Sequence, residues 1–571
     1  PRPTSTHPRE LGFTPQKPVG WLAPLLLLST GLRTLLAVLF GAYLDKRELQ
    51  NALPGDIFEQ PGVDGELWLD YVSDLGDGFN ATYSVAYLLA QPSLELDGRP
   101  LPRGQVLLMG GDQVYPLANG DGYEDRMKGP YRAALPQRPL DGHQPTLFAL
   151  PGNHDWYDGL TAFLRLFARR KDAHIGGWRT AQRRSYFAVK LPASWWLFGI
   201  DEQFGAYIDD PQLLYFEKAA RTLGPDDRII VITPSPTWVK GAEKPAAYDS
   251  VDYFIRTIVA PTGAQVSLLI SGDLHHYARY SGPDRELITC GGGGAYLLAT
   301  HTLPEALTVP PRETLTRGSS PSREYRLAER YPASADSRRM SWGVFRRLPV
   351  RNPGFATMLG IVQTLTILAM AGASSRGGDI QRLFTIPLVM MLVLIIGGAV
   401  MFAQPPGASS DRHARHWILG LLHGVAQIGL AAGATWVWLR LPFHEWRWPG
   451  PLIVAAVGYG PIIGFLAAQV TSAYLLVAGW FKVNVNELFA GQGIEDAKCF
   501  LRMHIRADGT LTIYSVAVDK VCRKWVADPD GAVDQPWLKP ATPLATRLIE
   551  PPIVVARAGV PATTPPMDSS T

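Results

Sequence analysis

The pattern of hydrophobic and polar positions divides the chain into two kinds of sequence. Between Glu66 and about Tyr296, short apolar runs rich in β-branched and aromatic residues are separated by polar or helical stretches. Runs of this length and composition predict strands. The strands are expected at residues 67–72, 105–109, 146–150, 186–189, 195–199, 229–233, 266–270 and 286–288. This part of the chain is therefore expected to form an α/β domain.

Four much longer apolar blocks follow, at residues 354–373, 383–403, 417–441 and 452–481. Each has the roughly 20 residues that an α-helix needs to cross about 30 Å of hydrocarbon. Four such blocks divided by short polar loops favour an α-helical transmembrane bundle over the core of a soluble protein. In the last block Pro461 lies beside two glycines, which predicts a kinked or tilted helix or a re-entrant turn.

The distribution of charge supports this division. Residues 353–481 contain only nine Asp, Glu, Lys and Arg residues, about 7%, whereas the other 442 residues contain 96, about 22%. The net charge of +3 lacks the electrostatic footprint of a nucleic-acid-binding protein, so no nucleic-acid partner is expected. Three cysteines in 571 residues indicate a reducing compartment and no structural disulfides.

Arginines before the first long block predict its orientation. Residues 322–351 contain eight Arg and three acidic residues, whereas the loops after the first and third blocks contain two Arg each. Because positively charged flanks stay in the cytoplasm, the α/β domain is expected on the cytoplasmic side of a bacterial-type membrane. Four spans return the chain after Phe481 to the same side. An earlier apolar run at 21–44 contains Arg33 and predicts either an interfacial helix or a fifth span.

The remaining segments complete the predicted organisation. Its parts are a disordered N-terminus at 1–20, a membrane-associated helix at 21–48, the α/β domain at 60–320, a basic juxtamembrane linker at 321–352, the four-helix transmembrane region at 353–481, a small C-terminal α/β module at 482–540 and a disordered tail at 541–571. In the C-terminal module, Lys498, Arg502 and Arg506 follow one another at four-residue spacing. This spacing predicts a solvated face, and docking of that face onto the α/β domain is the alternative.

Polar residues follow the predicted strands in a recurring way. The first three strands end in SDLGDG, GGDQVYP and PGNHDW, and three later strands end in PSPTW, SGDLHHY and TCGGGG. Each string alone is ordinary turn chemistry. Residues just beyond strand ends gather at one edge of a sheet, where α/β folds bind ligands. The combination therefore indicates a polar site built from carboxylate, Asn and His side chains.

This ordered set of motifs resembles that of the calcineurin-like metallophosphoesterases, over roughly residues 66–301. The D-x-G of Asp74 and the GDxxY of Asp112 and Tyr115 are similar to the purple acid phosphatase variant of the motifs. A GNHD string and a closing motif at His275 complete the pattern. The whole chain also resembles membrane-linked bacterial members. The resemblance implies a β-sandwich flanked by helices (αββα) with two metal ions at the strand ends.

The resemblance also implies which residues hold the metal ions. Asp74, Tyr115 and His275 would bind the first ion, and Asp112 would bridge the two ions. Asn153 would bind the second ion. Two ions about 3.5–4 Å apart would activate a shared water and clamp phosphoryl oxygens during in-line attack.

The residues after Asn153 would act on the leaving group. In the family pattern His154 would protonate the leaving group or stabilise the phosphoryl group in flight. Asp155 would orient the imidazole of His154. A histidine is suited to this task because its pKa lies near neutral pH.

Two departures from the family pattern affect the second ion. Asp273 stands in place of the first His of the closing motif, and the segment around Ser235 lacks the expected His. The second ion would then be bound by oxygen atoms alone, from Asp112, Asn153, Asp273 and Ser235. Oxygen ligands favour Mn²⁺, Fe²⁺ or Mg²⁺ and disfavour Zn²⁺ at this position, unless it is only weakly filled. Asp77 and His301 are the nearest candidates to compensate.

The predicted function is hydrolysis of a phosphomonoester or phosphodiester by a membrane-tethered, metal-dependent phosphoesterase. A phosphate ester and membrane lipids are the expected partners, while the substrate and the oligomeric state stay open. The two lost His residues leave an alternative, a degenerate domain that binds a ligand or metal and regulates the membrane bundle. A transporter is the third interpretation, disfavoured because the apolar blocks lack charged residues near their centres.

Overall fold

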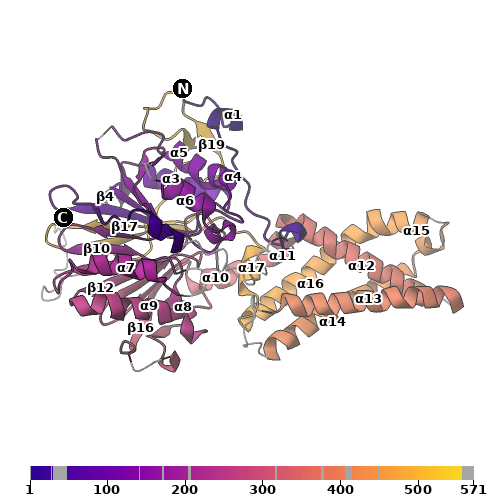
Figure 1. The fold of residues 1–571 in the computed structure, drawn as a ribbon. Helices are drawn as coiled ribbons and strands as arrows, with labels where there is room; N and C mark the ends of the chain where they lie inside the picture. Colours follow the sequence, from indigo (N-terminus) through magenta and orange to yellow (C-terminus); the bar gives the residue numbers. More distant parts are fainter. Residues whose placement is uncertain are drawn as a thin grey trace, which may run out of the picture. The chain divides into compact units, whose positions relative to one another are not determined.

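The computed structural model describes residues 2–27, 29, 48–140, 142–169, 173–202, 207–314, 318–374, 378–404, 414–447 and 449–555. The chain forms two compact units (Figure 1). The first unit combines Pro1–Val19, Phe40–Ser334 and Glu495–Thr571, and the second combines Gly20–Leu39 and Ala335–Ile494. Most of the predicted membrane-associated helix at 21–48 lies outside the described residues.

Two large sheets form the centre of the first unit. One has the strand order β1-β9-β10-β11-β12-β14-β13-β16-β15. Its strands are β1 (Phe58–Glu59), β9 (Phe187–Lys190), β10 (Trp195–Gly199), β11 (Arg228–Thr233), β12 (Gln265–Ser271), β13 (Tyr277–Ser281), β14 (Glu286–Cys290), β15 (Ala306–Val309) and β16 (Arg323–Tyr331). Strands β10, β11, β12 and β14 are parallel neighbours, so their carboxyl ends lie at one edge.

The other sheet has the order β21-β18-β17-β2-β5-β6-β8-β7, and β22 also pairs with β18. Its strands are β2 (Leu67–Val72), β5 (Val106–Met109), β6 (Thr146–Ala149), β7 (Ala173–Ile175), β8 (Trp178–Thr180), β17 (Lys498–Ile505), β18 (Leu511–Val518), β21 (Arg547–Leu548) and β22 (Ile553–Val555). Strands β2, β5 and β6 are parallel. All eight strands that the sequence predicts are confirmed, with ends that differ by two residues at most.

Helices cover the outer face of each sheet, and the inner faces pack on each other (Figure 1). The outer layers include α3 (Phe79–Ala90), α5 (Gly129–Ala134) and α6 (Thr161–Phe167) on one side and α7 (Asp210–Ala220) and α9 (Asp249–Phe254) on the other. Between the sheets, the rings of Phe148 and Phe187 lie 5.1 Å apart. Successive side chains of a strand point to opposite faces, so these buried strands have apolar residues on both. The predicted α/β class is confirmed.

The C-terminal stretch differs from the prediction, because residues 498–505 form a central strand instead of part of a separate module. Strand β17 pairs with β2 on one side and with β18 on the other. Lys498 and Arg502, predicted on a solvated face, are fully buried. Arg502 forms a two-pronged ion pair with Asp70 of β2, at 2.7 and 3.0 Å. A four-residue spacing places side chains on one face of a helix and also on one face of a strand, so it could not distinguish them.

Two segments that the sequence assigns to disorder contribute to the first unit where they are described, and so does the beginning of the predicted linker, up to Ser334. Leu11 and Phe13 are buried in its core, although residues 1–20 are predicted to be disordered. Strands β21 and β22, within the predicted tail at 541–571, pair with β18. Residues 556–571 of that tail lie outside the described residues. A few apolar anchors and the free edge of β18 are enough to order these polar segments.

The basic segment predicted as a juxtamembrane linker begins as strand β16, paired with β13 and β15. Tyr325 and Tyr331 are buried while the intervening arginines reach outwards, which is the alternation of an amphipathic strand. Helices α10 (Ser334–Ser341) and α11 (Val344–Arg351) follow.

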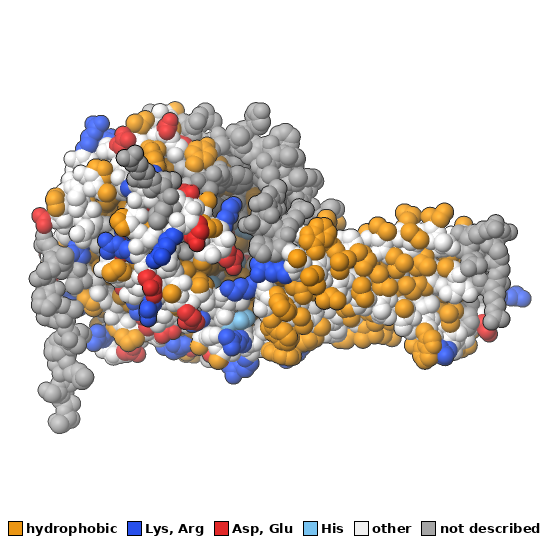
Figure 2. Space-filling view, turned by 90° about the horizontal axis from the view of Figure 1, so that it is seen from below, with side chains coloured by type: hydrophobic (Ala, Val, Ile, Leu, Met, Phe, Trp, Pro, Cys, Tyr) orange, Lys and Arg blue, Asp and Glu red, His pale blue; other side chains and the backbone are white. Residues whose placement is uncertain are grey.

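Among its described residues, the second unit contains four helices that are long and apolar enough to cross a membrane. They are α12 (Pro353–Ala373), α13 (Gly378–Phe402), α14 (Ala414–Trp438) and a continuous helix over Gly450–Trp480 that includes α15 (Gly450–Ile453) and α16 (Gly460–Trp480). Figure 2 shows hydrophobic side chains covering the visible surface of these helices. The four predicted spans are thus confirmed as apolar helices.

Pro461 does not break the fourth helix. A π-helical stretch at Val454–Tyr459 comes just before Gly460 and Pro461, and the helix continues beyond them. A π-helical turn lets the chain pass a residue that lacks an N–H without a re-entrant turn. Inside the bundle, Gln427 of α14 contacts Gln363 of α12 at 2.9 Å and Thr471 of α16 at 3.2 Å. Such hydrogen bonds hold apolar helices together where no hydrophobic force acts between them.

Candidate functional site

Three aspartates leave their strands in the same unusual backbone conformation. Asp74 follows β2, Asp112 follows β5 and Asp273 follows β12, with φ values of 62°, 49° and 64°. The left-handed region is disfavoured for residues with a side chain, although Asp tolerates it better than most. Strain of this kind persists where the surrounding structure enforces it, and it concentrates at functional sites. The repeated turn brings three carboxyl-bearing residues to one edge of the first unit.

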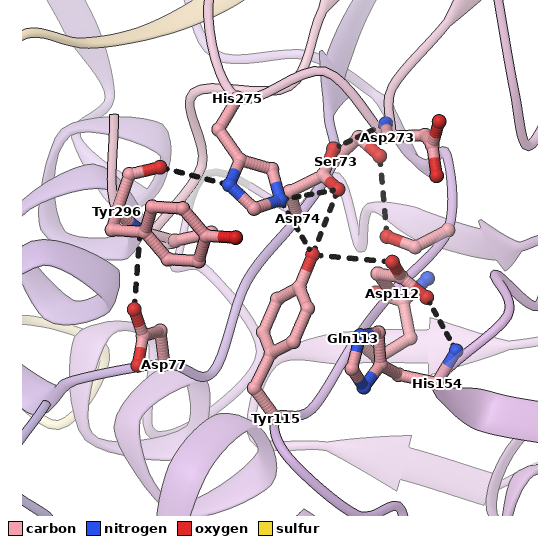
Figure 3. A network of polar contacts seen from close by, with 12 residues as sticks. Ser73, Asp74, Asp77, Asp112, Gln113, Tyr115, His154, Asp273, His275 and Tyr296 are labelled. Atoms are coloured by element: carbon pink, nitrogen blue, oxygen red, sulfur yellow. Dashed lines mark hydrogen bonds and ion pairs between the residues drawn. The ribbon is translucent and has the colours of Figure 1, made fainter. Parts of the chain in front are cut away.

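The hydroxyl group of Tyr115 lies where three of the predicted ligands meet (Figure 3). Its oxygen is 2.9 Å from Asp74 Oδ1, 3.2 Å from Asp112 Oδ2 and 3.1 Å from His275 Nε2. His275 Nδ1 lies 2.8 Å from the carbonyl oxygen of Tyr296. A carbonyl oxygen only accepts hydrogen bonds, so Nδ1 carries the proton and Nε2 presents its lone pair to the site.

Burial determines the electrostatics of this cluster. Burial, followed by the charges of Asp112 and Asp273, raises the pKa of Asp74 well above its usual value. The pKa of Asp112 is also raised, first by burial and then by Asp273, against the opposing effect of His154. Burial, helped by the nearby Lys498, lowers the pKa of His275 to about 3, so its imidazole is neutral. The site thus gathers carboxyl groups whose charge is poorly compensated by the protein.

The chemistry of these donors fits a divalent metal ion. Two carboxylates, a phenol oxygen and a neutral imidazole nitrogen are ligands that Mn²⁺ and Fe²⁺ accept. As the side chains stand, however, no three His, Cys, Asp and Glu residues in the described parts of the chain could hold an ion together. The Tyr115 hydroxyl fills the point on which Asp74, Asp112 and His275 converge. Metal binding there would require this hydroxyl to lose its proton or to move.

The two predicted catalytic residues lie beside the cluster, but their contacts differ from the prediction. The backbone N–H of His154 donates to Asp112 Oδ1 at 2.8 Å, and its ring packs edge-on against Tyr115 with centroids 4.5 Å apart. The Nδ1 atom of His154 is 3.0 Å from the carbonyl oxygen of Pro116, so a backbone carbonyl orients the ring.

Asp155, predicted to orient His154, is occupied elsewhere. It accepts hydrogen bonds from the Tyr123 hydroxyl and from the backbone amides of Gly152 and Gln113, the latter two at 2.8 and 3.2 Å. Burial and the charge of Asp112 raise its pKa to about 8. Its contacts make Asp155 a brace for the GNHD loop.

The residues predicted for the second metal ion do not converge as the first set does. The amide of Asn153 is 3.5 Å from the Tyr157 hydroxyl, and the buried Ser235 Oγ has no hydrogen-bond partner among the described residues. Asp273 donates its backbone N–H to Asp74 Oδ2 at 2.9 Å, while its carboxylate points away from Tyr115 (Figure 3). That carboxylate forms a 2.7 Å ion pair with Lys240 Nζ.

Asp77 has backbone partners, and His301 lies in a connection between strands. Asp77 accepts hydrogen bonds from the backbone amides of Val19 and Tyr296, at 2.8 and 3.1 Å. It therefore braces the N-terminal segment against the loop behind His275. His301 is half-buried in the connection between β14 and β15.

Sequence reasoning missed Lys240 and Glu202, which belong to the same region. Partial burial lowers the pKa of Lys240, but the carboxylate of Asp273 at 2.7 Å outweighs it and leaves the pKa raised, so the ammonium stays charged. Burial raises the pKa of Glu202 to about 8, aided by Asp201 and Asp273 and opposed by Lys240. The only signal for Lys240 is its place five residues after Ser235, in the segment that lacks the expected His.

Comparisons with known proteins add little to this picture. No protein-family model matches the chain, and no curated protein matches it by sequence. Among solved structures the chain is similar to "GAP50 the anchor in the inner membrane complex of Plasmodium", with 15% sequence identity and a TM-score of 0.30, over 40% of this chain and 73% of that chain. A TM-score this low does not indicate a shared fold. The functional interpretation therefore rests on this chain's own residues.

Proposed function

We propose that this protein is a membrane-tethered, metal-dependent phosphoesterase that hydrolyses a phosphomonoester or phosphodiester. The observation that supports the proposal most is the meeting of Asp74, Asp112 and His275 at the Tyr115 hydroxyl, just beyond the ends of parallel strands. The motifs that contain these residues resemble those of calcineurin-like metallophosphoesterases in type and order. The four apolar helices supply the tether.

Asp74, Asp112, Tyr115 and His275 would hold a divalent ion such as Mn²⁺ or Fe²⁺. When bound, such an ion acidifies a coordinated water and polarises a phosphoryl oxygen. The carbonyl of Tyr296 keeps the proton of His275 on Nδ1, which leaves Nε2 free to bind. His154, partly exposed beside Asp112, would donate a proton to the leaving oxygen.

One observation favours the alternative function, a domain that binds a ligand and regulates the membrane bundle without catalysis. The Tyr115 hydroxyl lies within 3.2 Å of Asp74, Asp112 and His275 and fills the point on which they converge, so a protein group stands where an ion would bind. A regulator of this kind could bind a ligand or a metal but would not hydrolyse phosphate esters, so hydrolysis separates the two functions.

The test is hydrolysis by the full-length protein purified in detergent. With Mn²⁺ supplied, it is expected to cleave an aryl phosphate or an aryl phosphodiester. Asp112→Asn is expected to lower the rate at least about 100-fold and to lose bound Mn²⁺, because it removes a central ligand. Asp121→Asn, at an exposed position of α4 (Gly120–Tyr123), is the matched control and should leave both unchanged. Inactivity with Mg²⁺, Mn²⁺, Fe²⁺ and Zn²⁺ on both substrates, together with no bound metal, would refute the proposal.

A further inference from the structure

We infer that the ammonium group of Lys240 takes the place of the second metal ion, so that the site holds one metal ion and uses Lys240 to bind a phosphoryl oxygen. The inference rests on the proposed function and specifies how that site meets its substrate. It assigns a role to a residue outside the motifs that the sequence brings forward.

The position of Lys240 supports this role. Asp273 connects Lys240 to the cluster around Tyr115, because its backbone N–H binds Asp74 Oδ2 at 2.9 Å and its carboxylate binds Lys240 Nζ at 2.7 Å. Asp273 is the residue that would have to bind the second ion. Its carboxylate is directed to Lys240 and away from Tyr115 (Figure 3). A positive charge supplied by the protein thus occupies this side of the site.

A second metal ion would find a poor set of ligands in this site. Imidazole nitrogens are missing at both places where the motif pattern has them, at Asp273 and near Ser235. Asp112 Oδ1 already accepts the backbone N–H of His154. A divalent ion would have to compete with Lys240 for Asp273 and recruit neutral oxygens from Asn153 and Ser235. The ammonium group of Lys240 is covalently attached to the chain, so it needs no set of ligands to hold it in the site.

Lys240 comes from the chain segment in which the expected His is missing. Strand β11 ends at Thr233, and the segment that lacks the expected His leads into α8 (Thr237–Lys240). Lys240 is the last residue of this helix. The same connection that loses a metal ligand therefore delivers a cation.

The Lys240 side chain is accessible from solvent. The Lys240 side chain is 44% exposed, whereas its partner Asp273 is 17% exposed, so the ammonium can meet a ligand from solvent without leaving Asp273. An ammonium is a compact charge with three N–H donors, and one donor to Asp273 leaves two for phosphate oxygens.

The experiment measures metal content and phosphate binding on the full-length protein in detergent. Mn²⁺ per chain is determined by elemental analysis after gel filtration, and inorganic phosphate is titrated into the Mn²⁺-loaded protein by calorimetry. The wild type is expected to hold one Mn²⁺ per chain. Lys240→Met is expected to keep that ion but to bind phosphate about tenfold more weakly or worse, because a charged hydrogen-bond donor is lost. Lys240→Arg should restore most of the affinity.

Lys244→Met is the matched control, since Lys244 is an exposed lysine four residues further along and should leave both measurements unchanged. Two Mn²⁺ per wild-type chain would overturn the inference while supporting a metal-dependent phosphoesterase. Unchanged phosphate affinity in Lys240→Met would also overturn it. No bound metal in the wild type after exposure to Mg²⁺, Mn²⁺, Fe²⁺ and Zn²⁺ in turn would overturn both proposals. Circular dichroism of each variant shows that it is folded, and Lys240→Arg keeps the test valid where Lys240→Met is unstable.

Discussion

Two ion pairs of the first unit each join a basic side chain to an aspartate, but in opposite surroundings. Arg502 and Asp70 are 0% and 3% exposed and join two central strands, whereas Lys240 and Asp273 are 44% and 17% exposed at a strand end. Each carboxylate oxygen of Asp70 accepts a hydrogen bond from Arg502, and Asp70 also accepts one from the backbone N–H of Gly104. The fully satisfied pair serves the fold. In the Lys240–Asp273 pair, here called the open pair, Asp273 does not use every N–H donor of the ammonium. A ligand can accept hydrogen bonds from the remaining donors.

The largest effect expected from this comparison is on stability. Asp70→Asn should destabilise the first unit by about 3–5 kcal/mol, because it leaves the charge of Arg502 buried without a partner. Denaturant unfolding of the full-length protein, followed by tryptophan fluorescence, measures this. The double variant Asp70→Leu with Arg502→Met removes both charges and should lie much closer to the wild type. A loss below about 1 kcal/mol for Asp70→Asn would erase the distinction between the pairs.

A smaller effect on stability, which depends on pH, is expected from the carboxyl group of Glu202. The pKa of Glu202 is raised to about 8, chiefly by burial, so the folded protein holds this proton more tightly than the unfolded chain. The resulting stability is present below about pH 4.5 and is lost as pH rises towards 8. Glu202→Gln should remove this slope, which is on the order of a few kcal/mol across the interval.

Unfolding of the metal-free protein at pH 5, 6, 7 and 8 measures the slope. The matched control is Glu324→Gln, whose side chain is 58% exposed on β16 and should leave the slope as it is in the wild type. An unchanged slope in Glu202→Gln would place the pH dependence on other groups.

The smallest effect is expected at the open pair itself. Lys240→Met should change the free energy of unfolding by no more than about 1 kcal/mol, because exposed ion pairs contribute little to stability. The same unfolding measurement applies. A loss as large as that of Asp70→Asn would make the Lys240 pair a structural one and remove the contrast.

Strands and strand ends could be predicted from the sequence because each leaves a local signal. A buried parallel strand is a short apolar run, and the residue after it is placed by the strand itself. Asp74, Asp112 and His275 were therefore brought to one cluster correctly. Lys240 was missed because it lies at the end of a four-residue helix, where no periodicity marks a residue as facing a site.

Strand β17 and its place in the central sheet were missed for a different reason. Strand β17 buries Lys498 and Arg502, so polar residues lie at positions where a buried strand usually has apolar ones. Their partners, the carbonyl of Ala295 and the carboxylate of Asp70, are more than 200 residues away in the chain. No local pattern reports a partner at that distance.

The pairing of β2 with β17 constrains how the chain can be threaded and made. Strand β2 precedes the four apolar helices and β17 follows them, and yet the two are hydrogen-bonded neighbours. The number of membrane crossings between Ser334 and Glu495 must therefore be even, whichever side the domain occupies, and four satisfies this parity. Strand β17 must also have emerged from the ribosome before it can pair with β2 in the second sheet. Until then β2 has an open edge, so insertion of the helices precedes completion of the domain.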